Sequence, residues 1–392
     1  MPTRNDRLSA QNKLDVIKQS IKEIEIIAEV EESGQEIERL PFELAEQMEV
    51  VRLLGDGNSA VVVMVQVKET REEKALKIIK PQNIPNLKEL IETELTIMSK
   101  IDHEFIVRMY EHWFIDDSWY ISLELIPEGD LFEALRSARY FDERSSASLI
   151  KCLSSALSYL HSQHIVHRDV KMENLLIFYD YSRDFELPYL KLADFGLATE
   201  FGEDLLYDLC GTPSYVSVET LSGVGYREKS DLWSCGVITY ILLCGFPPFQ
   251  SPNNDQEELF GQILKAKFFF PSPVWDKISF SARNLICNML TVNVDERYSA
   301  EQVYNNDWVA LLGNVTKEFE DIQEFELEDR LARNASAQMP FEDLSDDSDN
   351  SEFYYQKHRS FDDISQSSNI NKYESPIHRQ RERSDSFLIT KR

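Results

Sequence analysis

The spacing of apolar residues changes along this chain of 392 residues, and each spacing predicts a different kind of element. Between Gln11 and Glu38 the apolar residues stand three or four positions apart among lysines and glutamates, which predicts one face of an amphipathic helix. The residues of this face are Leu14, Ile17, Ile21, Ile24 and Ala28. Such a helix could dock a partner, dimerise, pack on its own chain, or form only in part.

From Val50 onward the apolar residues occur in short runs that are typical of strands. The run from Val51 to Val65 predicts two strands joined by a Gly-containing turn, and Ala75–Lys77 lies in a further β-rich stretch. Tyr120–Ile126 predicts a buried strand that stops at Pro127. Helical spacing is found over Leu87–Ile101, Leu131–Ser137 and Ser145–His161.

A later stretch is apolar on all sides. Asp231–Cys244 predicts a helix buried in the middle of the helical part, and Trp308 marks the last expected core residue. The longest apolar run, Gly236 to Phe246, is too short to span a bilayer.

Composition divides the chain into three parts. Acidic residues are dense from Glu318 to Asp329, and Ser, Asp, Asn and Gln dominate the remainder, so we expect disorder beyond roughly Ala337. The predicted division is an acidic extension with the amphipathic helix at 1–48, a folded domain at 49–309, and an acidic, Ser-rich tail at 310–392.

Charge and cysteine content exclude several classes of function. The chain has 41 basic and 69 acidic residues, a formal net charge of -28, which opposes general binding to nucleic acid or to an anionic membrane and favours basic partners. The five cysteines form no Cys-x-x-Cys pair, which is typical of reduced intracellular thiols. We therefore expect a soluble cytoplasmic protein, and nothing in the sequence opposes access to the nucleus.

One loop carries the chemistry on which the functional hypothesis depends. In His167-Arg-Asp-Val-Lys-Met-Glu-Asn174, Asp169 can orient and deprotonate a hydroxyl, Lys171 can lie against a transferring phosphoryl group, and Asn174 can hold a metal ion. Twenty positions after Asn174, Asp194 of Asp-Phe-Gly is placed to bind a Mg²⁺ that bridges nucleotide phosphates. A solvated charged loop would not explain why matching motifs stand upstream.

Those upstream motifs are a Gly-rich turn and a strand lysine. Gly55 and Gly57 let the backbone approach phosphates, Val62 can cover an adenine, and Lys77 fits the lysine that pairs with the α- and β-phosphates. Glu94 is the expected partner of Lys77, with Glu92 as the alternative.

The sequence also predicts three long-range contacts. Asp231 would be costly to bury alone, so we expect it to accept hydrogen bonds from the backbone of the loop at His167. Arg297 suits a bidentate ion pair with Glu219. Thr212 could be modified, but it is expected to contact Asp169 and Lys171 rather than to serve as a switch.

From about Leu40 to Trp308 the chain resembles protein kinases of the calcium/calmodulin-dependent group, and within that group the doublecortin-like kinases. The motifs that carry the resemblance are Gly55-Asp-Gly-Asn-Ser-Ala60, Asp130-Leu-Phe, His161 to Asn174, Asp194-Phe-Gly-Leu-Ala-Thr199, Cys210-Gly-Thr-Pro, Gly236 to Phe249 and Phe270-Pro-Ser-Pro-Val-Trp275. The resemblance implies an α+β, bilobal kinase fold with a small β-rich N-lobe and a larger helical C-lobe. Lys171 is similar to the lysine of serine/threonine kinases rather than tyrosine kinases.

The resemblance also implies a set of site residues and the cofactors ATP and Mg²⁺. Those expected to carry catalysis are Asp169, Lys171, Asn174, Asp194, Lys77 and Glu94, with Asn174 and Asp194 as metal ligands. Those expected to bind the nucleotide are Leu54, Gly55, Asp56, Gly57, Asn58, Ser59, Ala60, Val61, Val62, Ala75, Lys77, Glu124, Ile126, Asp130 and Leu176.

Several residues depart from the family pattern without removing a group that touches phosphate or metal. Ser217-Val-Glu219 replaces Ala-Pro-Glu, and Met172, Ser59 and Glu128 replace a proline, an aromatic residue and a glycine. The segment from Leu197 to Glu219, the activation segment in this family, is predicted to be a polar, mobile loop. Its Asp208 stands where related kinases usually have a threonine that becomes phosphorylated.

The predicted activity is ATP-dependent phosphorylation of protein Ser or Thr residues. Glu173 and Asp130 are carried over as acids that favour basic residues near the target. The acidic segment Phe319–Glu328 disfavours calmodulin, which usually binds a basic helix. The alternative hypothesis is a pseudokinase that presents partners without turnover; Lys77, Asp169, Asn174 and Asp194 are all present, which favours the enzyme.

Overall fold

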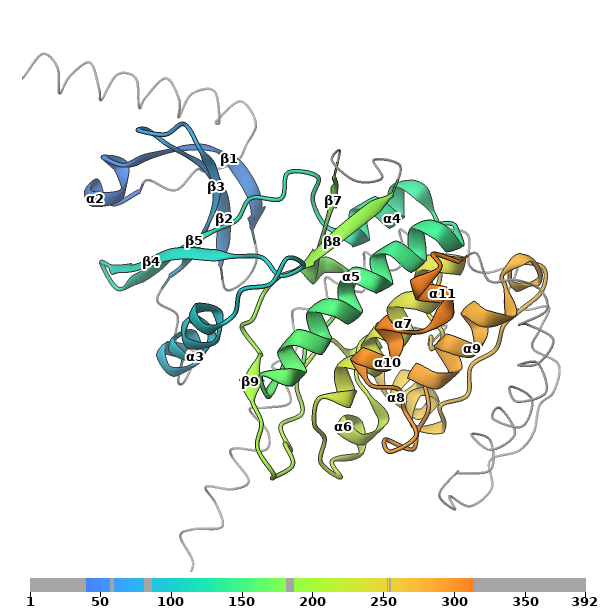
Figure 1. The fold of residues 1–392 in the computed structure, drawn as a ribbon. Helices are drawn as coiled ribbons and strands as arrows, with labels where there is room; N and C mark the ends of the chain where they lie inside the picture. The colour runs from blue at the N-terminus through green and yellow to red at the C-terminus, as the bar shows by residue number, and fades with distance from the viewer. Residues whose placement is uncertain are drawn as a thin grey trace, which may run out of the picture. The chain divides into compact units, whose positions relative to one another are not determined.

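The computed structural model describes residues 40–56, 60–80, 87–180, 187–251, 253 and 255–313. The predicted helix within residues 11–38, the turn residues Gly57, Asn58 and Ser59, and the tail from residue 314 lie outside these ranges. The described chain forms two compact units. The first comprises described residues up to 80 together with Met109–Leu125, and the second comprises those within Asn86–Arg108 and from Ile126 onward (Figure 1).

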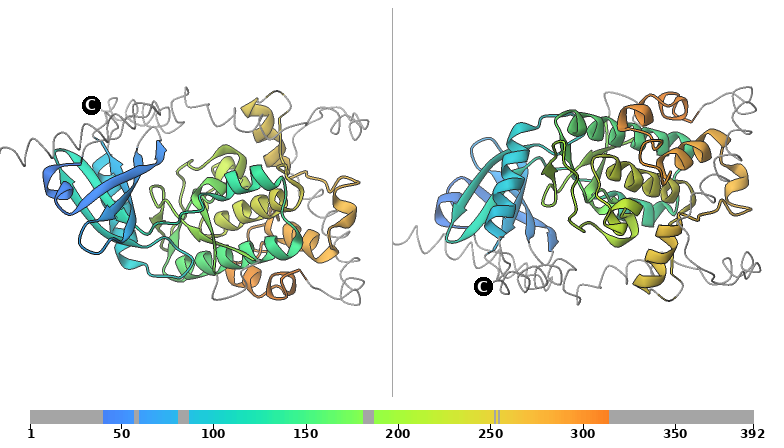
Figure 2. Two further views of the ribbon diagram at one scale, coloured as in Figure 1. Left: turned by 90° about the horizontal axis from the view of Figure 1, so that it is seen from above. Right: turned by 90° about the horizontal axis from the view of Figure 1, so that it is seen from below.

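The second unit is mainly helical. Its helices are α3 (Leu87–Lys100), α4 (Leu131–Ala138), α5 (Glu143–Ser162), α6 (Val218–Ser222), α7 (Lys229–Cys244), α8 (Gln256–Lys265), α9 (Phe280–Met289), α10 (Ala300–Tyr304) and α11 (Asp307–Ala310). Short 3-10 turns are η1 (Met172–Asn174), η2 (Pro213–Tyr215) and η3 (Trp275–Lys277). Figure 2 shows α8 at the margin of this unit in both views.

The helix predicted to be buried on all sides is confirmed in α7. Every residue from Ser230 to Cys244 is buried. The helix ends at Gly245, whose φ of 85° is a left-handed conformation that favours glycine. Trp308 is fully buried, as expected, but Val309 is buried as well, so the core extends one residue further than predicted.

The helical unit also contains two pairs of strands and an isolated bridge that position the candidate site. The pairs are formed by β6 (Ile165–Val166) with β9 (Thr199–Glu200), and by β7 (Leu175–Tyr179) with β8 (Pro188–Leu192). An isolated bridge joins Leu206 to Tyr226. The segment predicted as a loop from Leu197 to Glu219 therefore contains β9, η2 and this bridge, because backbone pairs this short leave no apolar alternation in the sequence.

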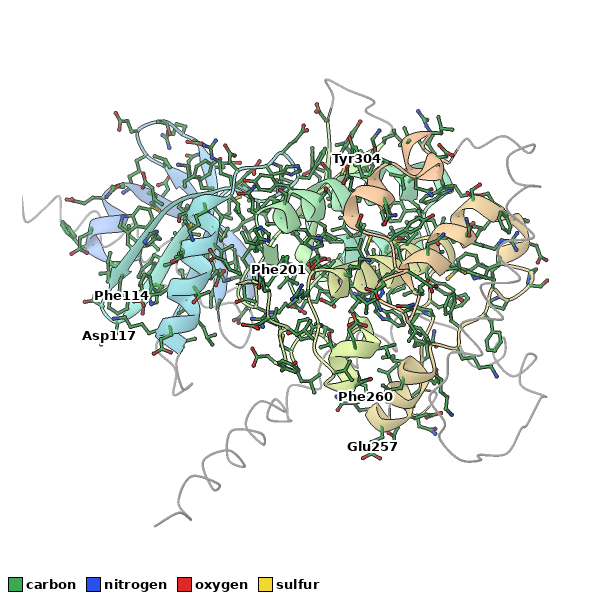
Figure 3. The ribbon with its side chains drawn as sticks, turned by 60° about the horizontal axis from the view of Figure 1, so that its bottom comes forward. Phe114, Asp117, Phe201, Glu257, Phe260 and Tyr304 are labelled. Atoms are coloured by element: carbon green, nitrogen blue, oxygen red, sulfur yellow. The ribbon has the colours of Figure 1, made fainter. Side chains whose placement is uncertain are left out.

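The first unit is a five-stranded antiparallel sheet in the order β1-β2-β3-β5-β4. Its elements are α2 (Phe42–Ala45), β1 (Met48–Asp56), β2 (Val61–Val67), β3 (Glu73–Ile79), β4 (Met109–Ile115) and β5 (Ser118–Leu123). Asp116 and Asp117, both with positive φ, form the tight turn between β4 and β5, and Figure 3 labels Asp117 there beside Phe114. The predicted strand Tyr120–Ile126 ends three residues early, at Leu123, ahead of Pro127.

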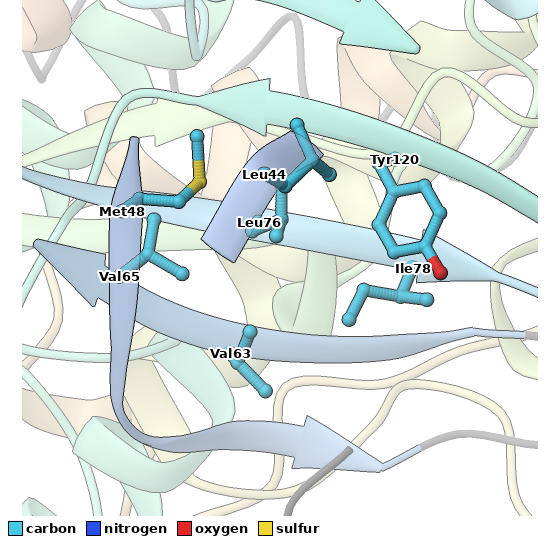
Figure 4. Packing of buried hydrophobic residues seen from close by; sticks show 7 residues of the cluster. All are labelled: Leu44, Met48, Val63, Val65, Leu76, Ile78 and Tyr120. Atoms are coloured by element: carbon cyan, nitrogen blue, oxygen red, sulfur yellow. The ribbon is translucent and has the colours of Figure 1, made fainter. Parts of the chain in front are cut away.

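One face of this sheet is covered by a core that begins ahead of the strands. Figure 4 shows its members packed together: Leu44, Met48, Val63, Val65, Leu76, Ile78 and Tyr120. Leu44 of α2 is fully buried, so α2 acts as a cap on the sheet rather than as a free extension. None of the described helices combines the length and apolar character needed to cross a bilayer.

Candidate active site

The loop from His167 to Asn174 is fixed by buried apolar side chains and by one buried carboxylate. Val170 and Met172 are buried, whereas Asp169 and Lys171, which alternate with them along the chain, are only partly buried. Asp231, at the start of α7, accepts hydrogen bonds from the backbone N–H of His167 at 3.0 Å and of Arg168 at 2.9 Å. The predicted anchoring of this loop by Asp231 is therefore confirmed.

Asp231 has a further partner that the sequence did not reveal. Nε2 of His161, on α5, lies 2.9 Å from Oδ2 of Asp231. Burial raises the pKa of the Asp231 carboxyl, but the hydrogen bonds and charges of His161 and His167 outweigh this effect and lower the pKa below its usual value. Asp231 therefore stays ionised and keeps the loop in one conformation.

The carboxylate of Asp169 contacts Thr212, Lys171 and Asn174. Its Oδ1 accepts hydrogen bonds from the N–H of Thr212 at 3.1 Å and from the Oγ1 of Thr212 at 2.8 Å. Its Oδ2 lies 2.7 Å from Nζ of Lys171, which also donates to Thr212 Oγ1 at 3.2 Å. The predicted contact of Thr212 with both Asp169 and Lys171 is confirmed.

The charge state of Lys171 follows from these contacts. Desolvation lowers the pKa of the ammonium, but the charge and hydrogen bond of Asp169 outweigh it, and Glu173 and Asp194 add to the effect, so the pKa is raised above its usual value. Lys171 therefore keeps a positive charge beside the carboxylate.

Asn174 is tied both to Asp169 and to the Asp194 motif. Its Nδ2 donates to the backbone oxygen of Asp169 at 2.9 Å and to Oδ2 of Asp169 at 3.2 Å. Its backbone oxygen accepts from the N–H of Ala193 at 2.8 Å. With the amide nitrogen so engaged, the amide oxygen of Asn174 is the atom available to face a cation.

The Asp194-Phe-Gly motif is positioned by Phe195. The ring of Phe195 is fully buried and packs edge-on against His167, with centroids 5.0 Å apart. Asp194 itself has a φ of 62°, a left-handed conformation that costs free energy in a residue with a side chain. The motif thus holds its carboxylate in a set position.

Glu94, on α3, also faces this motif. A Cβ placed on Gly196 would lie 3.4 Å from Oδ1 of Asp194 and 3.6 Å from Oε2 of Glu94. Glu94 is buried, whereas Glu92 is exposed and its Oε1 lies 3.8 Å from Nζ of Lys88. The environment therefore favours Glu94 over Glu92 as the functional carboxylate. The pairing of Glu94 with Lys77 stays a prediction.

In the first unit, several residues predicted to bind the nucleotide are paired with one another across neighbouring strands. Gly55 of β1 is paired with Val62 of β2, Val62 with Lys77 of β3, and Lys77 with Ile121 of β5. Residues paired across strands point to the same face, so Val62 and Lys77 share a face, and Ala75, two positions before Lys77, shares it too. A Cβ on Gly55 would meet no described atom within 4 Å, so its backbone is open to approach.

The other residues predicted to bind the nucleotide lie in or next to strands, apart from Asp130, which is bridged to a strand residue. Leu54 lies at an irregularity of β1, Asp56 pairs with Val61, and Ala60 is partly buried just before β2. Glu124 and Ile126 follow the end of β5, and Leu176 forms an isolated bridge with Asp130.

Asp130 has a structural task in addition to the predicted one. It is the N-cap of α4, where its Oδ1 accepts from the N–H of Glu133 at 2.9 Å. Desolvation raises the pKa of its carboxyl above the usual value, although this hydrogen bond acts in the opposite direction.

The end of the activation segment is fixed by a buried ion pair. The Nη1 and Nη2 atoms of Arg297 lie 2.6 and 2.8 Å from the two carboxylate oxygens of Glu219, which confirms the predicted bidentate contact. Burial raises the pKa of Glu219, but the hydrogen bonds and charge of Arg297 outweigh it and lower the pKa. Ser217 caps α6 by accepting from the N–H of Thr220, so it supports the helix start where the usual proline is missing.

The middle of the same segment is held more loosely. Nη1 of Arg168 lies 3.4 Å from Oδ2 of Asp208, and Nε of Arg168 donates to the backbone oxygen of Leu197 at 2.6 Å. Tyr226, which the sequence did not single out, donates its hydroxyl to the backbone oxygen of Asp208 at 2.8 Å. Arg168 thus contacts both the start and the middle of the segment.

Comparison with known proteins agrees with this geometry. The family model of the protein kinase domain matches residues 48–309. The chain is 42% identical to the serine/threonine-protein kinase zyg-8 of Caenorhabditis elegans over 373 residues, which is 94% of this chain and 43% of that protein. It is 46% identical to the serine/threonine-protein kinase DCLK1 of Rattus norvegicus over 279 residues, 71% of this chain and 64% of that protein.

A Drosophila melanogaster relative, the serine/threonine-protein kinase CG17528, is 42% identical over 72% of this chain and 37% of that protein. The chain therefore spans less than two thirds of the length of these relatives. The matched residues 48–309 contain both the strand lysine Lys77 and the loop at Asp169. The predicted resemblance to doublecortin-like kinases is confirmed, and the chain belongs to the protein kinase family.

Proposed function

We propose that this chain is a serine/threonine protein kinase that transfers the γ-phosphate of ATP to a protein hydroxyl. The observation that carries the proposal is the environment of Asp169. Its Oδ1 already accepts a hydrogen bond from the hydroxyl of Thr212 at 2.8 Å, which is the reach that a general base needs toward a substrate hydroxyl.

In the proposed reaction the substrate oxygen attacks the γ-phosphorus and the bond from that phosphorus to the oxygen it shares with the β-phosphate breaks. The hydroxyl proton passes to Asp169, and ADP leaves with the bond electrons. Lys171, held 2.7 Å from Asp169 and kept protonated, supplies positive charge beside the transferring group.

Asn174 and Asp194 fit a magnesium ion because an amide oxygen and a carboxylate are hard oxygen ligands of the kind that Mg²⁺ prefers. When bound, the ion would neutralise charge on the nucleotide phosphates. The residues that would hold it are linked through the backbone bond between Asn174 and Ala193. Their relative position is therefore set before any ion binds.

We propose that the nucleotide binds to the face of the first unit's sheet that carries Val62, Ala75 and Lys77. Gly55 would admit phosphates close to the backbone, Lys77 would pair with the α- and β-phosphates, and Val62 and Ala75 would cover the adenine. The shared face of Val62, Ala75 and Lys77 supports this assignment. Backbone groups of Glu124 and Ile126 remain the proposed partners of the adenine edge.

We further propose that substrates carry a basic residue, at the third position before the target Ser or Thr. Glu173 is exposed, and partial desolvation of its carboxyl raises its pKa, with the charges of Asp169 and Asp130 adding to the shift. A cationic side chain near Glu173 and Asp130 would offset this concentration of negative charge. We also propose that the activity does not depend on calmodulin, because Phe319–Glu328 is acidic and calmodulin usually binds a basic helix.

The test is phosphorylation of an arrayed peptide library by the full chain with ATP and Mg²⁺. We expect incorporation into Ser and Thr peptides, led by those with upstream Arg or Lys. Asp194→Asn is expected to abolish incorporation by weakening Mg²⁺-dependent nucleotide binding, which is measured separately by calorimetry. A chain that binds ATP but labels no peptide would support the pseudokinase alternative, and a consensus led by acidic or proline residues would reject the basic preference alone.

A further inference from the structure

The end of α8 and the chain that follows it expose apolar and basic side chains together. Leu264 and Phe269 are 46% and 63% exposed, and Lys265 and Lys267 are exposed beside them. Nζ of Lys267 lies 5.5 Å from the centroid of the Phe269 ring. Figure 3 shows the outer part of α8, where Glu257 and Phe260 are labelled, at the edge of the helical unit.

Phe269 is held in this outward position by its neighbours. Phe268 is buried, and the ring of Phe270 packs against Trp275 with centroids 4.6 Å apart. The backbone oxygen of Phe269 accepts a hydrogen bond from the hydroxyl of Tyr240 at 2.7 Å. The exposed ring therefore sits on a fixed backbone, and its exposure is a property of the fold.

The same stretch is positively charged, although the chain as a whole is acidic. From Leu264 to Arg283 it has four basic residues and one acid, a net charge of +3 in a chain of net charge -28. The acid, Asp276, accepts a hydrogen bond from Ser272 at 2.7 Å. Nε of Arg283 is buried and has no hydrogen-bond partner among the described residues. We call Leu264, Lys265, Lys267, Phe269, Lys277 and Arg283 the α8–α9 surface.

The described chain ends close to one end of this surface. Gly313 donates its N–H to the backbone oxygen of Trp308 at 2.8 Å, and a Cβ placed on Gly313 would lie 3.0 Å from Cβ of Glu143. Oε1 of Glu143 accepts from the N–H of Ser279 at 2.8 Å, and Ser279 lies between Lys277 and Arg283 in sequence. Gly313, the last described residue, therefore lies beside Glu143, which binds the residue just before α9.

The sequence that follows is complementary to the α8–α9 surface. Only residues 314–317 separate Gly313 from Glu318–Asp329, and four extended residues span about 13 Å. Glu318–Asp329 contains seven acids and no basic residue. Its apolar residues are Phe319, Ile322, Phe325 and Leu327.

We propose that residues 318–329 dock on the α8–α9 surface of their own chain. Their carboxylates face the lysines and Arg283, and their apolar side chains cover Leu264 and Phe269. Because the segment is tethered, its effective concentration at the surface is on the order of millimolar, so modest contacts suffice. An anionic partner from outside must instead approach a chain whose net charge repels it. The proposal does not rest on phosphotransfer activity.

The first test places the photo-crosslinking residue p-benzoylphenylalanine at position 269 of the full chain. We expect a cross-link within one chain, with peptides from 318–329 identified by mass spectrometry as its partner. A cross-link to residues 11–38, a cross-link between two copies, or the absence of any cross-link would overturn the proposal.

A charge-reversal series tests the electrostatic part. Lys265→Glu with Lys267→Glu should lower the cross-link yield at least fivefold, and adding Glu324→Lys with Glu326→Lys should restore it. The matched control, Asp346→Lys with Asp347→Lys, reverses two acids of the distal tail and should leave the yield unchanged. Both lysines are exposed, so the melting temperature should be unaffected. A loss that the tail reversal does not restore would contradict the proposed pairing.

Discussion

Two guanidinium–carboxylate pairs hold the activation segment, and they differ mainly in burial. Arg297 and Glu219 are 0% and 6% exposed and meet through two contacts of 2.6 and 2.8 Å. Arg168 meets Asp208 through one contact of 3.4 Å, and Asp208 is 79% exposed. The ion pair at the end of the segment is therefore buried and bidentate, whereas the one in its middle is open to solvent and has a single contact.

The environments explain the difference. Arg297 also donates to the backbone oxygens of Thr291 and Lys229, and its guanidinium lies 5.1 Å from the ring centroid of Trp233. Removing one partner there would leave a buried charge, whereas water can replace either partner of the Asp208 contact. We therefore expect mutations of the first pair to affect stability and mutations of the second to affect activity.

The largest effect is expected for the buried pair. Arg297→Met leaves Glu219 buried without its partner and should lower the free energy of unfolding by about 3–5 kcal/mol, measured by urea denaturation. The matched variant, Arg297→Met with Glu219→Leu, removes both charges and should recover much of this loss. A loss below about 1 kcal/mol for Arg297→Met alone would show that the buried pair stabilises the fold no more than the exposed pair does.

A smaller effect, on activity, is expected for the exposed pair. A carboxylate supplies about one negative charge where a phosphate supplies about 1.5 to 2, so we propose that Asp208 orders the segment partly and without modification. Asp208→Ala should change stability by about 1 kcal/mol or less and lower turnover by about two- to fivefold.

The measurement compares bacterially expressed, phosphatase-treated wild type with Asp208→Ala and Asp208→Thr. Wild type should be active without an upstream kinase, and Asp208→Thr should need phosphorylation to match it. Equal activity of wild type and Asp208→Ala would show that Asp208 is an ordinary surface acid.

The smallest effect is expected for His103, which is half-buried and so lies between the buried Glu219 and the exposed Asp208 in solvent exposure. Its Nδ1 accepts from the N–H of Phe105 at 3.1 Å, and its ring stacks on Tyr159 with centroids 5.1 Å apart. Desolvation lowers the pKa of His103 below 6.5, against the charges of Glu104 and Asp102. The imidazole of His103 therefore binds a proton more tightly in the unfolded chain than in the folded one. Its contribution to stability is fully present above pH 6.5 and is lost as the pH falls through the pKa of His103 in the folded protein.

The check is the free energy of unfolding at pH 7.5 and pH 5.5 for wild type and His103→Asn. The variant lacks the titrating ring and should show a smaller fall in stability at pH 5.5 than wild type. An equal fall in both proteins would show that His103 does not contribute to the loss of stability at pH 5.5.

Much of the catalytic loop could be predicted from sequence because its groups lie within eight residues and their spacing is itself the signal. The Arg297–Glu219 contact joins residues 78 positions apart, yet two complementary groups in motifs of known spacing indicated it. The contact of His161 with Asp231 was missed, because a histidine on a helix is equally compatible with solvent. The bridge between Leu206 and Tyr226 was missed because one backbone pair leaves no periodicity.

Asp169 is the proposed proton acceptor, and its role is tested most directly by kcat of the full chain and of Asp169→Asn on the best library peptide, with nucleotide affinity determined in parallel. Asp169→Asn should lower kcat by on the order of 10²–10⁴ while nucleotide binding is kept, because the general base and its orienting contacts are lost. Comparable turnover in the two proteins would contradict the assignment of this site as a kinase active site.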